Sequence, residues 1–271
     1  MGTLYGVYMV LIAVELFYLF TANHRRARVA GMASVIAAVA AHSNLGAVFG
    51  LEHSRPYWYG PLLPVYFIGS ALVCGAALLI LIVYLGDFFT NQRQLRQENV
   101  LLLDALRKLL ALFLGIIAFF TVWKLITGLS GERYHKYEVT LASLAGPLFF
   151  SFWFFETFLG LVVPLTILLG KKGKSPGWIA LAAALPMLSV FVTRYNFVYS
   201  GQMFSLKPVV GRLGEAMTYA PPFKGNVSGF LTYTPSMVEV LIVAGALSAA
   251  VLLFVGGLRA LRLSAKEASD V

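Results

Sequence analysis

The sequence is poor in charged residues, and this shortage excludes a whole class of protein. Charged residues make up 12% of the 271 residues, about half of the roughly 25% that is usual in soluble domains. Hydrophobic residues make up 59%, and the mean hydropathy is +0.80. A water-soluble globular domain is thereby excluded, and an integral membrane protein is predicted.

Cysteine and histidine are too scarce, or too poorly placed, to hold most metal cofactors. Cys74 is the only cysteine, which excludes a disulfide framework and a cysteine-ligated iron–sulfur cluster within this chain. A bis-histidine haem needs paired histidines at matched depth, but only His42 falls inside an apolar run, whereas the others lie in expected loops: His24, His53 and His135. No cluster of His, Cys and carboxylate residues has metal-ligand spacing. We therefore expect no haem, iron–sulfur cluster or metal in this chain.

Nucleotide-binding and hydrolase motifs are also missing, since no Walker loop, GxSxG elbow or HExxH helix occurs. The net charge of +9 would suit a nucleic-acid partner in a soluble protein. In a membrane protein, however, an excess of Lys and Arg usually marks the cytoplasmic loops. No nucleic-acid partner is therefore expected.

Long apolar segments are what the sequence has in abundance. A membrane-spanning helix needs about 20 apolar residues, and seven segments qualify, at about 3–22, 28–50, 61–86, 108–128, 141–169, 176–198 and 236–258. Residues 1–271 are thus expected to form a single all-α domain, a polytopic membrane helix bundle. Residues 91–108 carry apolar residues at helical spacing among charges and are expected to extend the fourth span into the cytoplasm.

Lys and Arg are unevenly distributed over the loops. Thirteen lie on the face that carries the 23–28 turn and the 171–174 loop, and six lie on the opposite face. The face richer in Lys and Arg should be cytoplasmic, which places the N-terminus outside and the C-terminus inside. The longest outer loop, about 199–235, is rich in Gly, Pro and Tyr and is expected to cover the outer mouth of the bundle.

Two carboxyl groups fall inside predicted spans. Ionisable residues at membrane depth usually face the bundle interior or water, and burial disfavours their charged form. Glu15 and Glu156 are therefore candidates for a proton relay, with Tyr8 one heptad from Glu15 on the same helix face. A neutral or paired structural acid is an equally good interpretation of each. Asp87, at the end of the third span, is better explained as an interfacial residue.

Three nitrogen-bearing side chains fall in the outer halves of their spans: His42, Lys124 and Arg194. Lys and Arg at such positions often extend to the interface, but three donors at similar depth could also line one polar pocket. His42 shares a helix face with Gly46 and Gly50, which leave room for a neighbouring helix or for a ligand. A histidine bonded to a neighbouring helix is the alternative.

Four stretches, taken together, resemble the NrfD/polysulfide reductase membrane-subunit family. They are HSNLGAVFGLEHSRPYWYGPLLPVYFIGSALVCGAALL (42–79), GPLFFSFWFFETFLGLVVPLTILL (146–169), RYNFVYSGQ (194–202) and YTPSMVEVLIVAG (233–245). The resemblance covers about residues 5–258 and rests on the order and spacing of these stretches. Larger members resemble two four-helix bundles with flanking helices. Compared with them, the chain is expected to lack about three opening helices, and another membrane chain is expected to complete the bundle.

The resemblance implies a subunit that exchanges electrons with menaquinone or ubiquinone in a prokaryotic inner (cytoplasmic) membrane, surrounded by lipid. Its expected partners are a ferredoxin-like iron–sulfur subunit and a catalytic (molybdenum-type) or multihaem cytochrome subunit. His42 would exchange a proton with a quinone oxygen, since histidine titrates near neutral pH. The predicted quinone site comprises His42, Asn44, Arg194, Lys124, Gln202 as a lid contact, and Tyr57 and Trp58, which could pack over the ring or anchor at the interface.

Two other functions stay open from the sequence. A passive anchor could dock redox subunits without binding quinone, and a secondary transporter could use the same polar residues. The chain shows no convincing inverted repeat of interrupted helices, which argues against a transporter. Coupling of electron transfer to proton translocation would extend the quinone interpretation rather than replace it.

Overall fold

The computed structural model describes residues 2–53, 55, 57–90, 97–130, 136–203 and 235–260. The helices in these ranges are α1 (Gly2–Phe20), α2 (His24–Gly50), α3 (Leu62–Thr90), α4 (Gln97–Leu129), α5 (Lys136–Ala145), the π-helix η1 (Ser151–Val162), α6 (Val163–Leu169), the short 3-10 helix η2 (Lys171–Lys174), α7 (Pro176–Gln202) and α8 (Met237–Ala260). The described residues contain no strand, which confirms the all-α prediction.

Seven helical segments within these ranges are long and apolar enough to cross a membrane, as predicted. The fourth begins at Gln97, so residues 97–108 of the charged segment continue the helix as predicted, whereas residues 91–96 lie outside the described residues. The predicted outer loop at about 199–235 lies largely outside the described residues, since only 199–203 and 235 fall within them.

The fifth span differs from its predicted bounds of 141–169. Residues 136–145 form the separate helix α5, and the span itself runs from Ser151 to Leu169 as η1 followed by α6. The chain turns at Gly146 and Pro147, where the Leu148 amide donates to Ala142 O at 3.2 Å. Proline lacks an amide donor and restricts the residue before it, so one continuous helix from residue 141 was the wrong prediction.

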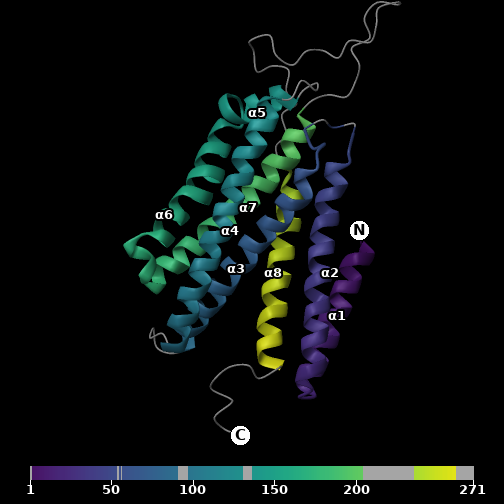
Figure 1. Cartoon of the computed structure of the whole chain (residues 1–271), viewed down its shortest axis with the longest axis vertical. Coiled ribbons are helices and arrows are strands. Elements are labelled where there is room, and N and C mark those ends of the chain that lie inside the picture. Colours follow the sequence, from purple (N-terminus) through teal and green to yellow (C-terminus); the bar gives the residue numbers. More distant parts are fainter. Residues whose placement is uncertain are drawn as a thin grey trace, which may run out of the picture.

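The main apolar core lies between α3, α4, α6 and α7 (Figure 1). It contains large aliphatic side chains from α3 and α4, such as Ile80, Leu110 and Leu114, all of which are at most 1% exposed. Ala182 and Ala183 of α7 are fully buried against them. Small residues let helix backbones approach closely in a membrane, so this face of α7 fits deep into the bundle.

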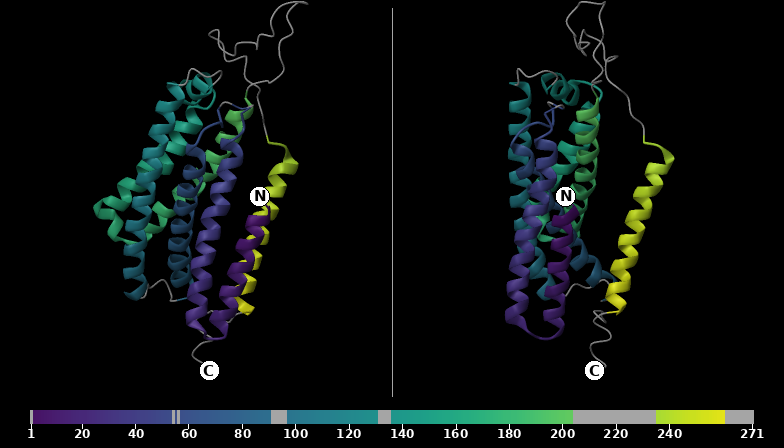
Figure 2. Two further views of the ribbon diagram at one scale, coloured as in Figure 1. Left: turned by 45° about the vertical axis from the view of Figure 1, so that its right-hand side comes forward. Right: turned by 90° about the vertical axis from the view of Figure 1, so that its right-hand side faces the viewer.

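The hairpin of α1 and α2 and the last helix α8 pack much less tightly. Helix α1 packs along α2 and buries none of its residues. None of the described residues of α8 is buried, and the helix stands apart from the other helices in the right-hand view of Figure 2. Apolar side chains on such surfaces are compatible with lipid or with neighbouring membrane helices.

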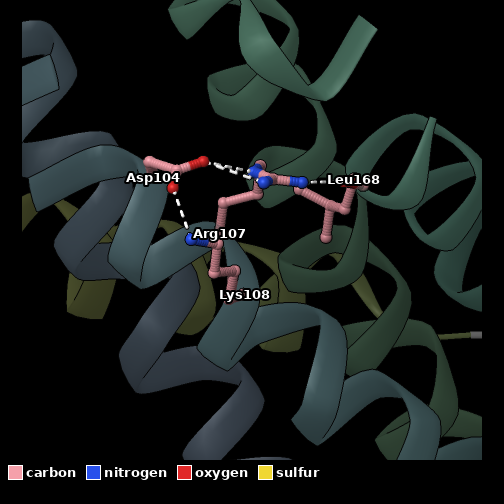
Figure 3. Close-up of polar contacts among 4 residues, drawn as sticks. All are labelled: Asp104, Arg107, Lys108 and Leu168. Carbon is pink, nitrogen blue, oxygen red and sulfur yellow. Dashed lines mark hydrogen bonds and ion pairs between the residues drawn. The ribbon is translucent and has the colours of Figure 1, made fainter. Parts of the chain in front are cut away.

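An ion-pair cluster ties α4 to the end of α6 (Figure 3). Arg107 donates to Asp104 Oδ1 from Nε at 3.0 Å and from Nη2 at 2.8 Å, and Lys108 Nζ lies 2.8 Å from Asp104 Oδ2. Arg107 Nη1 donates to the Leu168 carbonyl. The last carbonyls of a helix lack partners within the helix, so Arg107 satisfies one of them from a neighbouring helix.

The same end of the bundle holds the buried Asp87. Its Oδ2 accepts a hydrogen bond from Asn99 Nδ2 of α4 at 2.8 Å, and the residue is 7% exposed. Asp87 therefore joins the end of α3 to the first turns of α4. The interfacial position predicted for it is compatible with this pairing.

Candidate functional site

A cavity of about 330 Å³ lies at the end of the bundle that carries α5, within the usual size range for ligand sites. Residues 57–63, which run from the α2–α3 connection into the first turn of α3, form one wall, and the last turns of α4 form another. Helices α5, η1 and α7 supply the rest, through Lys136, Thr140, Ser143, Phe152, Glu156, Asn196, Phe197 and Ser200. The lining is mostly apolar, with a small set of polar groups among the hydrophobic side chains.

Trp58 fixes the wall between the 57–63 segment and α7. Its Nε1 donates to Phe197 O at 2.9 Å, and the residue is 8% exposed. The indole lies directly on Gly201, where an added Cβ would come within 1.9 Å of Trp58 Cε2. A glycine is therefore required at residue 201 for Trp58 to reach this position.

Glu156 lines the cavity from the π-helix η1 and is 9% exposed. Its Oε1 accepts a hydrogen bond from Asn196 Nδ2, and Asn196 Oδ1 accepts one from Ser151 Oγ at 2.9 Å. Close packing of η1 on α7 depends on Gly160, where a Cβ would lie 1.9 Å from Ser189 Oγ. Helices with i→i+5 bonds are rare and often occur at functional sites, and here one carries the only acidic side chain among the described residues that line the cavity.

Two cationic side chains and a free hydroxyl complete the polar lining. Lys124 Nζ lies 5.4 Å from the Tyr57 ring centroid, and Lys136 Nζ donates to Tyr59 O at 3.3 Å. Ser200 is 1% exposed, and its Oγ has no hydrogen-bond partner among the described residues. A buried hydroxyl without a partner is costly, so Ser200 is available to bind a ligand in the cavity.

The described residues bring no three His, Cys, Asp or Glu side chains close enough to hold a metal ion. The polar groups of the cavity are instead one carboxyl group, two ammonium groups, one amide and several hydroxyl groups. Such groups can hydrogen-bond and exchange protons with a small ligand that carries oxygen atoms.

A second hollow, a groove of about 400 Å³ between α2, α3 and α7, contains His42 and Arg194. His42 Nδ1 lies 3.0 Å from Ala38 O one turn earlier, and therefore donates to it, which leaves Nε2 for another partner. The Arg194 guanidinium stacks on Phe67 with its carbon 3.6 Å from the ring centroid, and Nη2 donates to Ser70 Oγ. The rest of the groove is largely apolar.

The glycines on the His42 face of α2 contact α3 and the turn that precedes it. A Cβ at Gly46 would lie 2.6 Å from Pro64 Cα, and one at Gly50 would lie 2.8 Å from Gly60 O. Both glycines therefore allow the close approach of a neighbouring helix, which is one of the two possibilities that the sequence left open.

The structure distributes the predicted quinone-site residues over these two hollows. Tyr57, Trp58 and Lys124 line the cavity, together with Glu156, which was predicted as a proton relay. His42 and Arg194 line the groove. The remaining two residues line neither, since Asn44 is half-buried on α2 and Gln202 is exposed at the end of α7.

The other predicted relay residues lie on the α1–α2 hairpin. Glu15 Oε2 accepts a hydrogen bond from Ser34 Oγ at 3.0 Å, and its Oε1 lies 2.7 Å from the position of a Cβ at Gly31. Tyr8 is half-buried on the same helix. Neither residue lines the cavity or the groove, so Glu15 matches the alternative of a paired carboxyl group between two helices.

Sequence reasoning missed a polar stripe on α7. Ser189, Thr193, Asn196 and Ser200 are each at most 9% exposed and follow one another at spacings of four, three and four residues. This spacing places them on one helix face, next to η1 and the cavity. The pattern is visible in the sequence, although the single charge at Arg194 draws attention first.

Comparison with known proteins agrees with this architecture. The family model described as polysulphide reductase, NrfD, matches residues 4–206. The Hdr-like menaquinol oxidoreductase integral membrane subunit of Archaeoglobus fulgidus is 27% identical over 270 residues, which cover 98% of this chain and 65% of that protein. A selenate reductase subunit of Mesobacillus selenatarsenatis is 26% identical over 238 residues, which cover 86% of this chain and 50% of that protein.

The chain spans between half and about two thirds of the length of these curated relatives. The family match, by contrast, extends over every described residue that lines the cavity, from Tyr57 to Ser200. This multi-pass integral membrane protein belongs to the NrfD polysulphide reductase family.

Proposed function

We propose that this chain is the quinol-interacting membrane subunit of an oxidoreductase complex, and that the quinone head group binds in the cavity at the α5 end. The observation that carries the proposal is the composition of that cavity. Apolar walls, which suit the ring of a quinone and its hydrocarbon chain, surround one buried carboxyl group, Glu156. Lys124 and the Ser200 hydroxyl, which has no partner among the described residues, belong to the same lining. Ligand sites commonly combine apolar walls with a few placed polar groups.

Oxidation of a quinol releases two electrons and two protons, so its site needs a proton acceptor near a ring oxygen. Glu156 fits that role, because Asn196 holds its carboxyl group at the cavity wall. Lys124 would stabilise the negative charge that develops on the oxygen as the proton leaves. The electrons would pass to an iron–sulfur cluster in a ferredoxin-like partner subunit, and from there to a catalytic or multihaem subunit.

The groove of His42 and Arg194 is the second candidate for the head group. His42 Nε2 is left available by the bond of Nδ1 to Ala38 O, and a histidine can exchange a proton near neutral pH. None of the described residues that line the groove, however, carries a carboxyl group. Glu156 with its amide partner therefore makes the cavity the better site for proton transfer.

The wider setting is also part of the proposal. The subunit would reside in a prokaryotic cytoplasmic membrane, with its N-terminus outside, beside redox subunits and a further membrane chain. The exposed surfaces of α1 and α8 offer places where such helices or lipid could pack. Menaquinol is named for the Archaeoglobus fulgidus relative, and the proposal includes both menaquinone and ubiquinone as substrates.

The experiment compares Glu156→Gln with Glu15→Gln in the intact, purified complex. We expect Glu156→Gln to lower quinol-linked turnover by a factor on the order of 100, the scale of lost general acid–base catalysis. Glu15→Gln should stay near the wild-type rate. Electron transfer from a soluble donor to the partner subunits should be unchanged in both, since that path does not use this chain.

His42→Gln in the same complex separates the two hollows. Loss of turnover in His42→Gln with normal turnover in Glu156→Gln would move the head group to the groove. Normal turnover in both variants would contradict quinol chemistry at either hollow and would favour a passive anchor.

A further inference from the structure

A small internal hollow of about 30 Å³ lies between α3, α4, η1 and α7. Glu156 lines both this hollow and the cavity, and Arg194 lines both this hollow and the groove. Five other polar side chains belong to its wall: Tyr66, Ser70, Thr121, Ser189 and Thr193. The hollow therefore lies between Glu156, the proposed proton acceptor, and Arg194.

Arg194 has one donor group that no described residue satisfies. Its Nη2 donates to Ser70 Oγ, and its guanidinium stacks on Phe67. Its Nη1 is buried and has no hydrogen-bond partner among the described residues. A buried, unpaired donor on a charged group is strongly unfavourable, so an acceptor is needed beside Nη1.

Water fits the hollow in both size and chemistry. A buried water molecule needs a cavity volume of roughly 10–15 Å³ and two to four polar partners. The volume of the hollow, about 30 Å³, exceeds this requirement. An apolar group would leave Arg194 Nη1 unpaired, and an anion would be repelled by an ionised Glu156. One or two water molecules can accept from Arg194 and donate to the carboxyl group at the same time.

We propose that ordered water in this hollow bridges Arg194 Nη1 to the Glu156 carboxyl group, and that Arg194 is thereby a positioning residue for Glu156. Two cations then act on this carboxyl group, Lys124 from α4 across the cavity and Arg194 from α7 through water. Asn196 and Thr193 hydrogen-bond it directly, and Tyr66 of α3 lines the same hollow. The role of Arg194 in catalysis rests on the proposed function, whereas the water site does not.

The test fills the hollow without touching either charged group. Val73 of α3 is 1% exposed and lines the hollow, so Val73→Leu would occupy the space of the water with apolar atoms. The matched control is Val83→Leu, on the same helix, where the side chain packs against the same core but does not line the hollow. Thr193→Val is a second variant, which keeps the side-chain shape and does not fill the hollow, but removes a wall hydroxyl group that itself hydrogen-bonds the Glu156 carboxyl group.

Two measurements on the intact complex decide the question. The first is the infrared O–H stretch of buried water, identified by its shift in water labelled with oxygen-18. The second is the pH profile of quinol-linked turnover. We expect Val73→Leu to remove the labelled band and to move the acidic limb of the profile upward by about one pH unit, because the carboxylate loses its coupling to Arg194. Val83→Leu should match wild type, and Thr193→Val should shift the band.

Each contrary result has a distinct meaning. The absence of a labelled band in the wild-type complex, or a band that is the same in Val73→Leu, Thr193→Val and wild type, would overturn the water site. A band lost in Val73→Leu with an unchanged pH profile would overturn the positioning role. Unaltered turnover in Glu156→Gln would instead refute the proposed function, and the infrared band would still decide whether the water is present.

Discussion

The two membrane-embedded carboxyl groups, Glu156 and Glu15, occupy very different surroundings. Glu156 lies on a π-helix, is 9% exposed, is bonded to a side-chain amide and lines a cavity. Glu15 lies on an α-helix without buried residues and accepts from the hydroxyl group of Ser34. In the sequence the two look alike, because each is a lone acid within an apolar run. Their neighbours on other helices give one a candidate chemical role and the other a candidate packing role.

The largest difference should follow from removal of each carboxyl group's hydrogen-bond partner. Asn196→Leu keeps the side-chain size but removes the bond to Glu156, so we expect quinol-linked turnover to fall about 10- to 100-fold, since a hydrogen bond to a charged group contributes about 1.5–3 kcal/mol. Ser34→Ala removes the partner of Glu15 and should change turnover less than about twofold. Steady-state kinetics of the two purified complexes measure both turnover rates. An equal loss of turnover in the two variants would show that Glu156 and Glu15 do not differ in their roles.

A smaller effect is expected from the ammonium group at the cavity. Lys124→Met should lower the turnover number about tenfold, because one charge that stabilises the developing oxyanion is lost while most of the apolar contact area is kept. Lys136→Met, at the rim of the same cavity, serves as the matched control and should have a weaker effect. A rise in KM with an unchanged turnover number would mean that Lys124 contributes to binding alone.

The packing at the wall of the cavity that Glu156 lines and the packing around Glu15 should also differ in their tolerance to a single methyl group. Gly201→Ala forces a Cβ against the Trp58 indole at 1.9 Å, whereas Gly31→Ala meets the flexible end of Glu15 at 2.7 Å. We expect the first change to cost about 1–3 kcal/mol of stability and the second clearly less. Thermal unfolding of the purified complexes gives the comparison, and an equal loss in both would show that Trp58 can move.

The last prediction concerns orientation and should leave turnover unchanged. A cysteine introduced by Ala268→Cys should resist an impermeant thiol reagent in intact cells, since the Lys and Arg distribution places the C-terminus in the cytoplasm. Labelling after permeabilisation is the positive control. Labelling from outside would reverse the orientation and place the opening of the cavity on the cytoplasmic face.

The spans were predictable because apolar length is a local property of the sequence. Which polar residues share a hollow was harder to predict, because the depth of a residue along its span does not determine the direction in which its side chain points. Lys124 and Arg194 were placed at similar depth, yet one lines the cavity and the other the groove. The break at Pro147 was open to prediction from proline chemistry. The π-helix was not, because its i→i+5 bonds depend on packing against α7, as at Gly160.

The π-helix has a consequence for the bilayer itself. The span of η1 and α6 contains 19 residues, and even a regular α-helix of that length would measure only about 28 Å. A π-helix puts more residues into each turn and rises less per residue, so this span falls short of the roughly 30 Å hydrocarbon layer. Its end at η2 lies higher in Figure 1 than the ends of α3 and α4. A bilayer can accommodate such a short span by thinning locally, and thinning beside η1 would bring the aqueous phase on that side closer to the middle of the span.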